Sequence, residues 1–140
     1  MQPASQDDFT LRDGIEGLTP PRIATLYRRA PLLRQTDSAK KLEQAYERSQ
    51  LVLSVWQGER LVGVARVLTD GVQVSYLCDL AVEPDVQGSG IGRMLIDEVM
   101  ERCKGTELVL RDSNLSAGFY EHLGFTHVEN GWVWEVKGEG

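Results

Sequence analysis

The stretch LAVEPDVQGSGIGR, residues 80–93, joins a β-strand to a helix through a loop that contains three glycines. Residues 72–82 favour a strand, and apolar residues recur at helical spacing over residues 95–103. Glycines let the backbone approach a ligand closely, and the first turn of a helix presents free amides and the positive end of its dipole. The stretch therefore predicts a site for a pyrophosphate or another anion, the alternative being a glycine turn that binds nothing.

Two common phosphate-binding motifs do not fit this loop. A P-loop requires a lysine followed by serine or threonine directly after its last glycine, and no lysine follows these glycines. A dinucleotide-binding fingerprint requires Gly-x-Gly-x-x-Gly; Gly88 and Gly90 fit it, but Arg93 occupies the third position. The loop must therefore belong to another class.

The segments that precede the loop predict an antiparallel meander. Residues 51–57, 61–69 and 72–82 are rich in β-forming residues and are separated by tight turns, of which Asp70-Gly71 is a strong hairpin signal. Strands joined by such short turns must be antiparallel.

The N-terminal part predicts a strand at residues 8–12 and two helices. The first helix begins at Thr19-Pro20-Pro21, a hydroxyl cap followed by prolines, and stops before Pro31. The second runs over residues 37–49.

After the glycine loop and its helix, the sequence predicts a strand at residues 107–111 and a helix at residues 114–123. A hairpin of residues 125–129 and 132–137, with an Asn130-Gly131 turn, closes the chain. The order β-α-α-β-β-β-α-β-α-β-β predicts an α+β (mixed α/β) fold with a mostly antiparallel sheet of about seven strands and four helices.

Length, charge and hydropathy indicate how many domains the chain forms, which partners it disfavours and where it is expected to be located. A chain of 140 residues is expected to form one domain, residues 1–140. Fifteen Lys and Arg against 21 Asp and Glu give a net charge of −6, which disfavours nucleic-acid binding. No apolar run is long enough for a membrane span, and the N-terminus does not resemble a secretory signal, so we expect a cytoplasmic protein. Trp132 and Trp134 share a strand face, which favours packing in the core or in a homodimer interface.

The cysteines and histidines predict neither disulfides nor a metal site. Cys78 and Cys103 are too few for a disulfide framework, and small buried thiols are expected. His122 and His127 do not share a helical face and have no carboxylate-rich ligand set around them.

Two motifs together resemble the GCN5-related N-acetyltransferase (GNAT) superfamily. Gln87-x-x-Gly90-x-Gly92, preceded by the strand ending Leu80–Pro84, looks like the acetyl-CoA signature of that family. Residues 114–125, NLSAGFYEHLGF, are similar to its Asn-x-x-Ala-x-x-Tyr-x-x-x-Gly-Phe block. The predicted order of elements also follows the family, so the resemblance covers nearly the whole chain.

The resemblance implies acetyl-CoA as cosubstrate and a place for each part of it. In the family, the pantetheine arm binds like an extra strand where the fourth and fifth strands splay apart, and loop amides hold the pyrophosphate. The implied binding residues are Leu80, Ala81 and Val82 for the arm, Gln87, Gly88, Ser89, Gly90, Ile91, Gly92 and Arg93 for the pyrophosphate, and Asn114 and Tyr120 beside the arm and its sulfur.

The resemblance also implies acetyl transfer to a primary amine by direct attack in a ternary complex. Tyr120 would protonate the departing thiolate, a role that a hydroxyl of pKa about 10 can fill. The expected acceptor is a small-molecule amine. A protein or peptide amine, and a CoA-binding regulatory module without catalysis, stay open as alternatives.

The general base is left open by the sequence. Tyr76 and Cys78 match positions where some relatives carry a glutamate or histidines, and neither residue type stands there. Asp79 is the nearest carboxylate, but strand alternation points it away from the face of Cys78 unless a bulge intervenes. The candidates are Asp79, Glu83 and Tyr76, each acting through water.

Overall fold

The protein was studied as a computed structural model, which describes residues 8–30, 32, 34, 36–112 and 118–135. These residues form one five-stranded sheet in which the strands follow one another in chain order. The first four strands are antiparallel neighbours, and the last is parallel to the fourth. The strands are β1 (Thr10–Asp13), β2 (Leu51–Gln57), β3 (Arg60–Thr69), β4 (Val74–Val82) and β5 (Glu107–Leu110).

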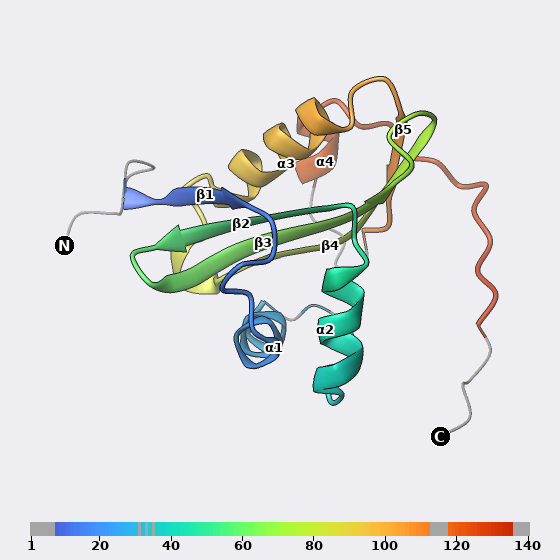
Figure 1. The fold of residues 1–140 in the computed structure, drawn as a ribbon. Coiled ribbons are helices and arrows are strands. Elements are labelled where there is room, and N and C mark those ends of the chain that lie inside the picture. Colours follow the sequence, from blue (N-terminus) through green and yellow to red (C-terminus); the bar gives the residue numbers. More distant parts are fainter. Residues whose placement is uncertain (1–7, 31, 33, 35, 113–117, 136–140) are drawn as a thin grey trace.

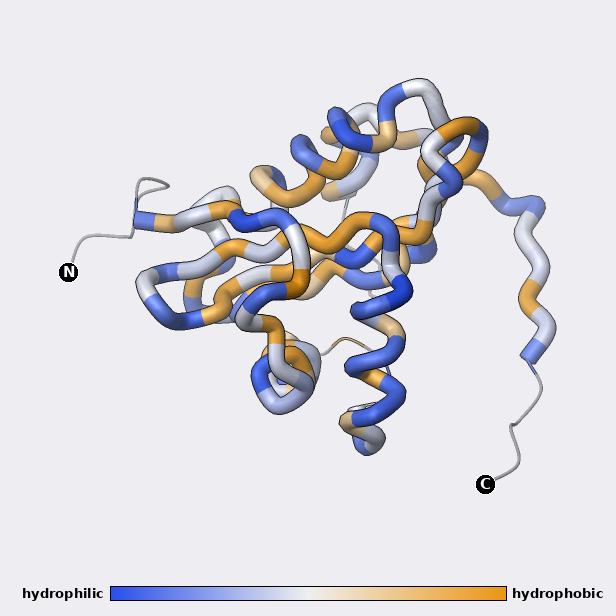
Figure 2. Tube along the Cα trace, viewed as in Figure 1, coloured by the Kyte–Doolittle hydropathy of each residue, from blue (hydrophilic) through white to orange (hydrophobic). Residues whose placement is uncertain are grey.

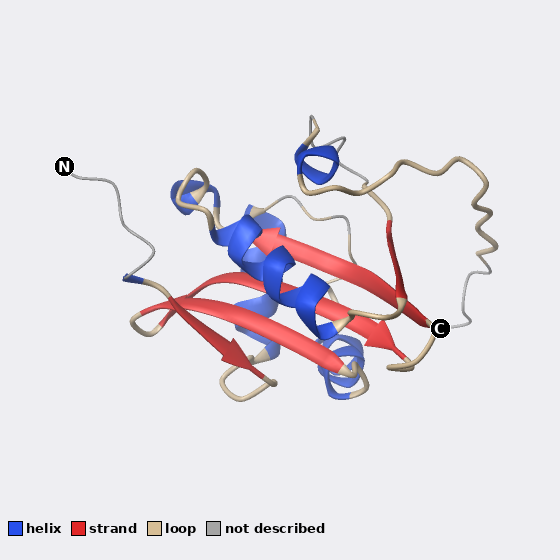
Figure 3. Ribbon diagram, turned by 90° about the horizontal axis from the view of Figure 1, so that it is seen from above, coloured by secondary structure: helices blue, strands red, loops and turns tan. Residues whose placement is uncertain are grey.

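Helices cover both faces of the sheet (Figure 1). One face carries α1 (Pro20–Arg29) and α2 (Ala39–Glu47), and the other carries α3 (Ile91–Arg102) with the short α4 (Phe119–His122) beside it. Seen from above, α3 crosses over the strands of the sheet (Figure 3). None of the helices in the described part of the chain is long and apolar enough to cross a bilayer.

Both helices of the first face start at the capping residues expected of such ends. The Thr19 hydroxyl accepts the N–H of Arg22 at 3.4 Å, and prolines fill the first two helical positions, which confirms the predicted start of α1. The Ser38 hydroxyl accepts the N–H of Lys41 at 3.2 Å and so caps α2.

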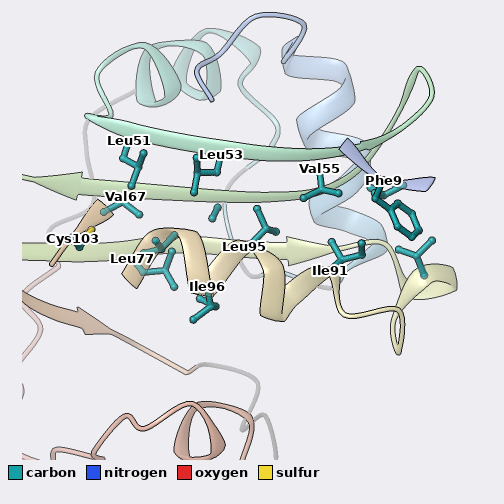
Figure 4. Packing of buried hydrophobic residues seen from close by; sticks show 14 residues of the cluster. Phe9, Leu51, Leu53, Val55, Val67, Leu77, Ile91, Leu95, Ile96 and Cys103 are labelled. Carbon is teal, nitrogen blue, oxygen red and sulfur yellow. The ribbon is translucent and has the colours of Figure 1, made fainter. Parts of the chain in front are cut away.

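Two apolar clusters, one on each side of the sheet, hold these layers together. The central strands are mostly apolar, whereas α2 is rich in hydrophilic residues (Figure 2). Nearly all of β2 and β3 is buried because helices cover both of their faces. The α3 side, shown in Figure 4, contains Phe9, Leu51, Leu53, Val55, Val62, Ala65, Val67, Leu77, Val86, Ile91, Leu95, Ile96, Val99 and Cys103. The α1 side contains Leu18, Ile23, Ala24, Leu26, Tyr27, Leu42, Tyr46, Val52, Trp56, Leu61, Val64 and Ala81.

Gly63 on β3 allows α3 to pack closely on the sheet. A Cβ at this position would lie 2.9 Å from Cγ2 of Ile91 and 3.1 Å from Cδ1 of Leu95, both of which are buried. We therefore expect Gly63→Ala to lower the free energy of unfolding by about 1–3 kcal/mol through overpacking, measured by urea denaturation. Gly131→Ala is the control, since a Cβ there meets nothing within 4 Å. An unchanged or higher midpoint for Gly63→Ala would contradict close packing.

The predicted C-terminal hairpin is wrong for the residues that the structure describes. Residues 125–135 contain no strand, so the sheet formed by the described residues has five strands instead of about seven. Gly131 lacks the positive φ of a type I′ turn, and an isolated hairpin is marginal unless its apolar face packs on other elements. The segment runs away from the sheet (Figure 1), with Trp132 97% and Trp134 89% exposed, so neither packs in the core. A homodimer interface stays a prediction.

The helix predicted at residues 114–123 is described only in its last part. α4 covers Phe119–His122, and residues 113–117, which include Asn114, lie outside the described residues. Gly124 follows the helix with φ of 95°, as the predicted C-terminal glycine should.

Candidate active site

The sheet opens between β4 and β5. The two strands pair only over Val74–Leu77 and Glu107–Leu110, although β4 continues to Val82. Residues 79–82 therefore have β3 on one side and, within the described part of the chain, no strand on the other. This separation is the splay that the sequence resemblance implied.

The backbone of β4 presents hydrogen-bonding groups to this opening. The N–H of Glu83 donates to the carbonyl of Val62 at 2.8 Å, so Glu83 faces β3. Because successive residues of a strand turn their backbone groups to opposite edges, Ala81 also faces β3, whereas Leu80 and Val82 face the opening. Of the three residues expected to bind the cosubstrate arm, two thus turn their backbone groups toward the opening.

The glycine loop leads from β4 into α3 by way of a short 3₁₀ turn, Pro84–Val86. Gly88 and Gly90 have φ of 92° and 82°, the left-handed region that suits glycine. Gly90 is the N-cap of α3 and supplies no capping side chain. The amides of Gly88 and of residues 90–93 donate to no backbone carbonyl within the described chain. The loop therefore offers several free amides at the positive end of a helix dipole, which suits a phosphate group.

Side chains of the loop have different surroundings. Ile91 is 1% exposed and anchors the loop in the core, so only its amide can meet a ligand. The side-chain amide of Gln87 donates to the carbonyl of Val82 at 3.4 Å. Arg93 is exposed and pairs with Asp97 at 3.1 Å.

Tyr120 lies in α4, which packs beside α3. A Cβ on Gly92 would be 3.5 Å from the ring of Phe119, so α4 packs against the first turn of α3. The Tyr120 ring makes edge-to-face contacts with Phe119 and Phe125 at centroid distances of 5.0 and 5.7 Å. These contacts hold the ring in place.

The surroundings of Tyr120 favour its protonated form. Burial and, to a smaller extent, the negative charge of Asp112 raise the pKa of Tyr120 to about 12. Tyr120 thus keeps its proton at neutral pH, as a proton donor must.

A β-bulge at Cys78 reverses the side-chain alternation of β4. Arg66 pairs with Asp79 and Val67 with Leu77, which leaves Cys78 without a partner on β3. Leu77 packs under α3, whereas Asp79 lies on the opposite face among residues of α1 and α2. Two residues apart in a regular strand would share a face. The bulge that the alternation argument allowed for is therefore present.

The Asp79 carboxylate is enclosed by donors. Its Oδ2 accepts from Nε of Arg66 at 2.7 Å and from the Tyr27 hydroxyl at 2.8 Å, and its Oδ1 accepts from Nε of Arg34 at 2.7 Å. The side chain is 1% exposed. These contacts join α1, the α1–α2 connection and two strands, and they favour a structural anion over a general base.

Tyr27 and Tyr46 extend this network between α1 and α2. Their hydroxyls are hydrogen-bonded to each other, and both side chains are buried. Burial is the largest cause that raises the pKa of each, so both stay protonated. The sequence gives no signal that these two tyrosines lie next to Asp79, because the three residues are far apart in the chain.

The other predicted base candidates are placed as follows. Glu83 is buried and pairs with Nε of Arg29 at 2.6 Å and with Arg60 at 3.5 Å, so its carboxylate is occupied. Tyr76 is half-buried on β4, opposite Val109 of β5 and next to the splay.

A comparison with models of known protein families finds a match for the chain. The model described as an acetyltransferase (GNAT) domain matches residues 28–135, which include β2 to β5 and the glycine loop.

Curated relatives agree with this assignment. The chain is 31% identical over 106 residues to an uncharacterized N-acetyltransferase of Prochlorococcus marinus, covering 71% of this chain and 55% of the relative. It is 28% identical over 127 residues to serotonin N-acetyltransferase 2, chloroplastic, of Oryza sativa, covering 84% and 61%. The chain thus spans little more than half the length of these relatives.

A solved structure shows the same architecture. A GNAT-family acetyltransferase from Streptococcus pneumoniae superposes with a TM-score of 0.74 at 26% identity, covering 93% of this chain and 99% of that one. The splay, the glycine loop at the start of α3 and the matched domain agree with one another. The chain therefore belongs to the GNAT family of acetyltransferases, as the sequence resemblance suggested.

Proposed function

We propose that this protein transfers the acetyl group of acetyl-CoA directly to a primary amine, and that the acceptor is a small molecule. One observation carries the proposal: the free amides of the glycine loop stand at the start of α3, next to the part of β4 that β5 leaves unpaired. GNAT acetyltransferases in general use acetyl-CoA.

The proposed binding mode follows from the polarity of this opening. The amides of Gly88 and residues 90–93 hold the pyrophosphate, for which a helix N-terminus is suited. The arm then runs along β4 toward Cys78, taking hydrogen bonds from Leu80 and Val82 as an added strand would. Asn114 is proposed beside the arm on the family resemblance.

The proposed reaction needs one proton donor from the protein. The amine lone pair attacks the thioester carbon, the C–S bond breaks, and the thiolate takes the Tyr120 proton; the amine nitrogen releases a proton to water, from which Tyr120 is protonated again. The raised pKa of Tyr120 keeps that proton available, and the same burial raises the proton affinity of a thiolate formed next to it. With Asp79 and Glu83 held in ion pairs, the amine is proposed to react in its neutral form, and Tyr76 through water is the remaining candidate base.

The choice of a small acceptor rests on a relative. The name of the rice protein specifies serotonin, a small amine, as its acceptor. A protein or peptide amine is the alternative acceptor, and a CoA-binding module without catalysis is the alternative function. Release of free thiol with small amines would separate the proposal from both. A cytoplasmic location also stays a prediction, since the rice relative is named as chloroplastic.

Cosubstrate binding tests the proposal through Gly90. With φ of 82°, even alanine is strained there, and a Cβ also approaches the bound phosphate. We expect acetyl-CoA to raise the melting temperature of the wild type, and Gly90→Ala to weaken binding by roughly 10-fold or more in calorimetry.

Gly71→Ala is the matched control for this experiment. Gly71 has φ of 74° in the β3–β4 turn, where a Cβ meets nothing within 4 Å, so the variant carries similar strain away from the loop. Its affinity for acetyl-CoA should equal that of the wild type. If the wild type does not bind acetyl-CoA at millimolar concentration, the catalytic and regulatory functions both fail.

A further inference from the structure

Arg34, from the α1–α2 connection, reaches the point where β4 and β5 separate. Its Nη2 donates to the carbonyl of Cys78 at 2.9 Å, and its Nε donates to Asp79. Cys78 directly follows Leu77, the last residue of β4 that pairs with β5. An arm that enters from the glycine loop and runs along β4 ends near this point. Arg34 therefore lies on the acceptor side of the proposed reaction centre.

The ion cluster around Asp79 carries a positive charge that is exposed mainly at Arg34. Two arginines share one carboxylate, which leaves a surplus of one positive charge although the whole chain has a net charge of −6. The exposed fractions of the side chains are 1% for Asp79, 10% for Arg66 and 42% for Arg34. Among the described residues of the cluster, Arg34 is thus the one that presents this charge to a molecule in the opening.

The Arg34 guanidinium also has unused donors. Of its five N–H groups, one on Nε and one on Nη2 are bound, and the others meet no acceptor among the described residues. The two bonds fix the plane of the group, so little conformational entropy is lost when it binds a ligand. A planar pair of N–H donors matches the two oxygens of a carboxylate.

We propose that Arg34 binds a carboxylate of the acceptor, so that this protein prefers amino acids to amines that lack a carboxylate. The inference rests on the proposed acetyl transfer. The carboxylate would balance the surplus charge of the cluster and place the nearby amine at the splay. A simple cationic amine would instead be repelled by the same charge.

The test compares matched acceptors. Phenylalanine with phenethylamine, tryptophan with tryptamine, and alanine with ethylamine differ by one carboxylate, and free thiol release gives kcat/KM for each. We expect the wild type to prefer the amino acid by roughly 10-fold or more in at least one pair, as for a charge-assisted hydrogen bond. Arg34→Gln should lose that preference, mainly through a higher KM for the amino acid. Its kcat/KM for the amine without a carboxylate should change by less than about 3-fold. Arg34→Lys should keep part of it.

Arg29→Gln is the matched control, because Arg29 also binds a buried carboxylate through Nε, that of Glu83. It should keep the wild-type preference. The inference would be overturned if Arg34→Gln lowered kcat/KM equally for both members of a pair, or if the wild type showed no preference for the amino acid. Acetyl transfer would still stand in either case. If acetyl-CoA yields no thiol with any acceptor, peptides included, the proposed function fails and this inference with it.

Discussion

Tyr120→Phe is expected to lower kcat by roughly 10²–10⁴-fold, the usual effect of removing a general acid. The change deletes only the hydroxyl, and the ring contacts with Phe119 and Phe125 remain. Affinity for acetyl-CoA should therefore change little. Steady-state kinetics of thiol release, with calorimetric binding of acetyl-CoA as control, measures both quantities. Equal losses in binding and turnover would show that Tyr120 acts through packing.

The pH dependence provides a second check on Tyr120. Because its pKa is raised to about 12, Tyr120 stays protonated from pH 7 to 9 and causes no fall in rate over that range. An alkyl amine of pKa about 10 loses its proton progressively as the pH rises, so the wild-type rate should climb throughout. Tyr120→Phe should keep the same slope at a lower rate. A wild-type rate that falls between pH 8 and 9 would contradict this assignment.

Asp79→Asn is expected to lower the free energy of unfolding by about 3–5 kcal/mol, because it leaves Arg66 and Arg34 without their buried anion. This loss is a large part of the 5–15 kcal/mol that stabilises a typical domain. Urea denaturation at pH 7 measures it. Asp85→Asn is the matched control: Asp85 is 54% exposed and bound by Arg60, so its loss should leave the urea midpoint nearly unchanged.

Activity separates the structural role of Asp79 from catalysis. If Asp79 is a structural anion, the folded fraction of Asp79→Asn should retain activity within roughly 10-fold and keep the rising pH profile. A wild-type rate that rises near pH 6 and levels off, with that rise abolished in the variant, would identify Asp79 as the general base.

Features that depend on neighbouring residues could be predicted from the sequence. The start of α1 follows from a hydroxyl three residues before the amide that it caps, and the meander follows from turns of a few residues. The glycine loop likewise lies between a strand and a helix that their own periodicities define. The prediction of a C-terminal hairpin was wrong, because a turn signal at Asn130-Gly131 does not show whether another element is present for the hairpin to pack against.

The sequence by itself determined the family, the position of the glycine loop and the order of elements up to β5, since each of these is encoded by residues close together in the chain. Only the tertiary structure decided the surroundings of Asp79. The bulge at Cys78 turns it toward α1, and its partners stand 13 to 52 positions away. Burial and charge pairing act through space, and strand alternation alone does not reveal which distant side chains a single extra residue brings together.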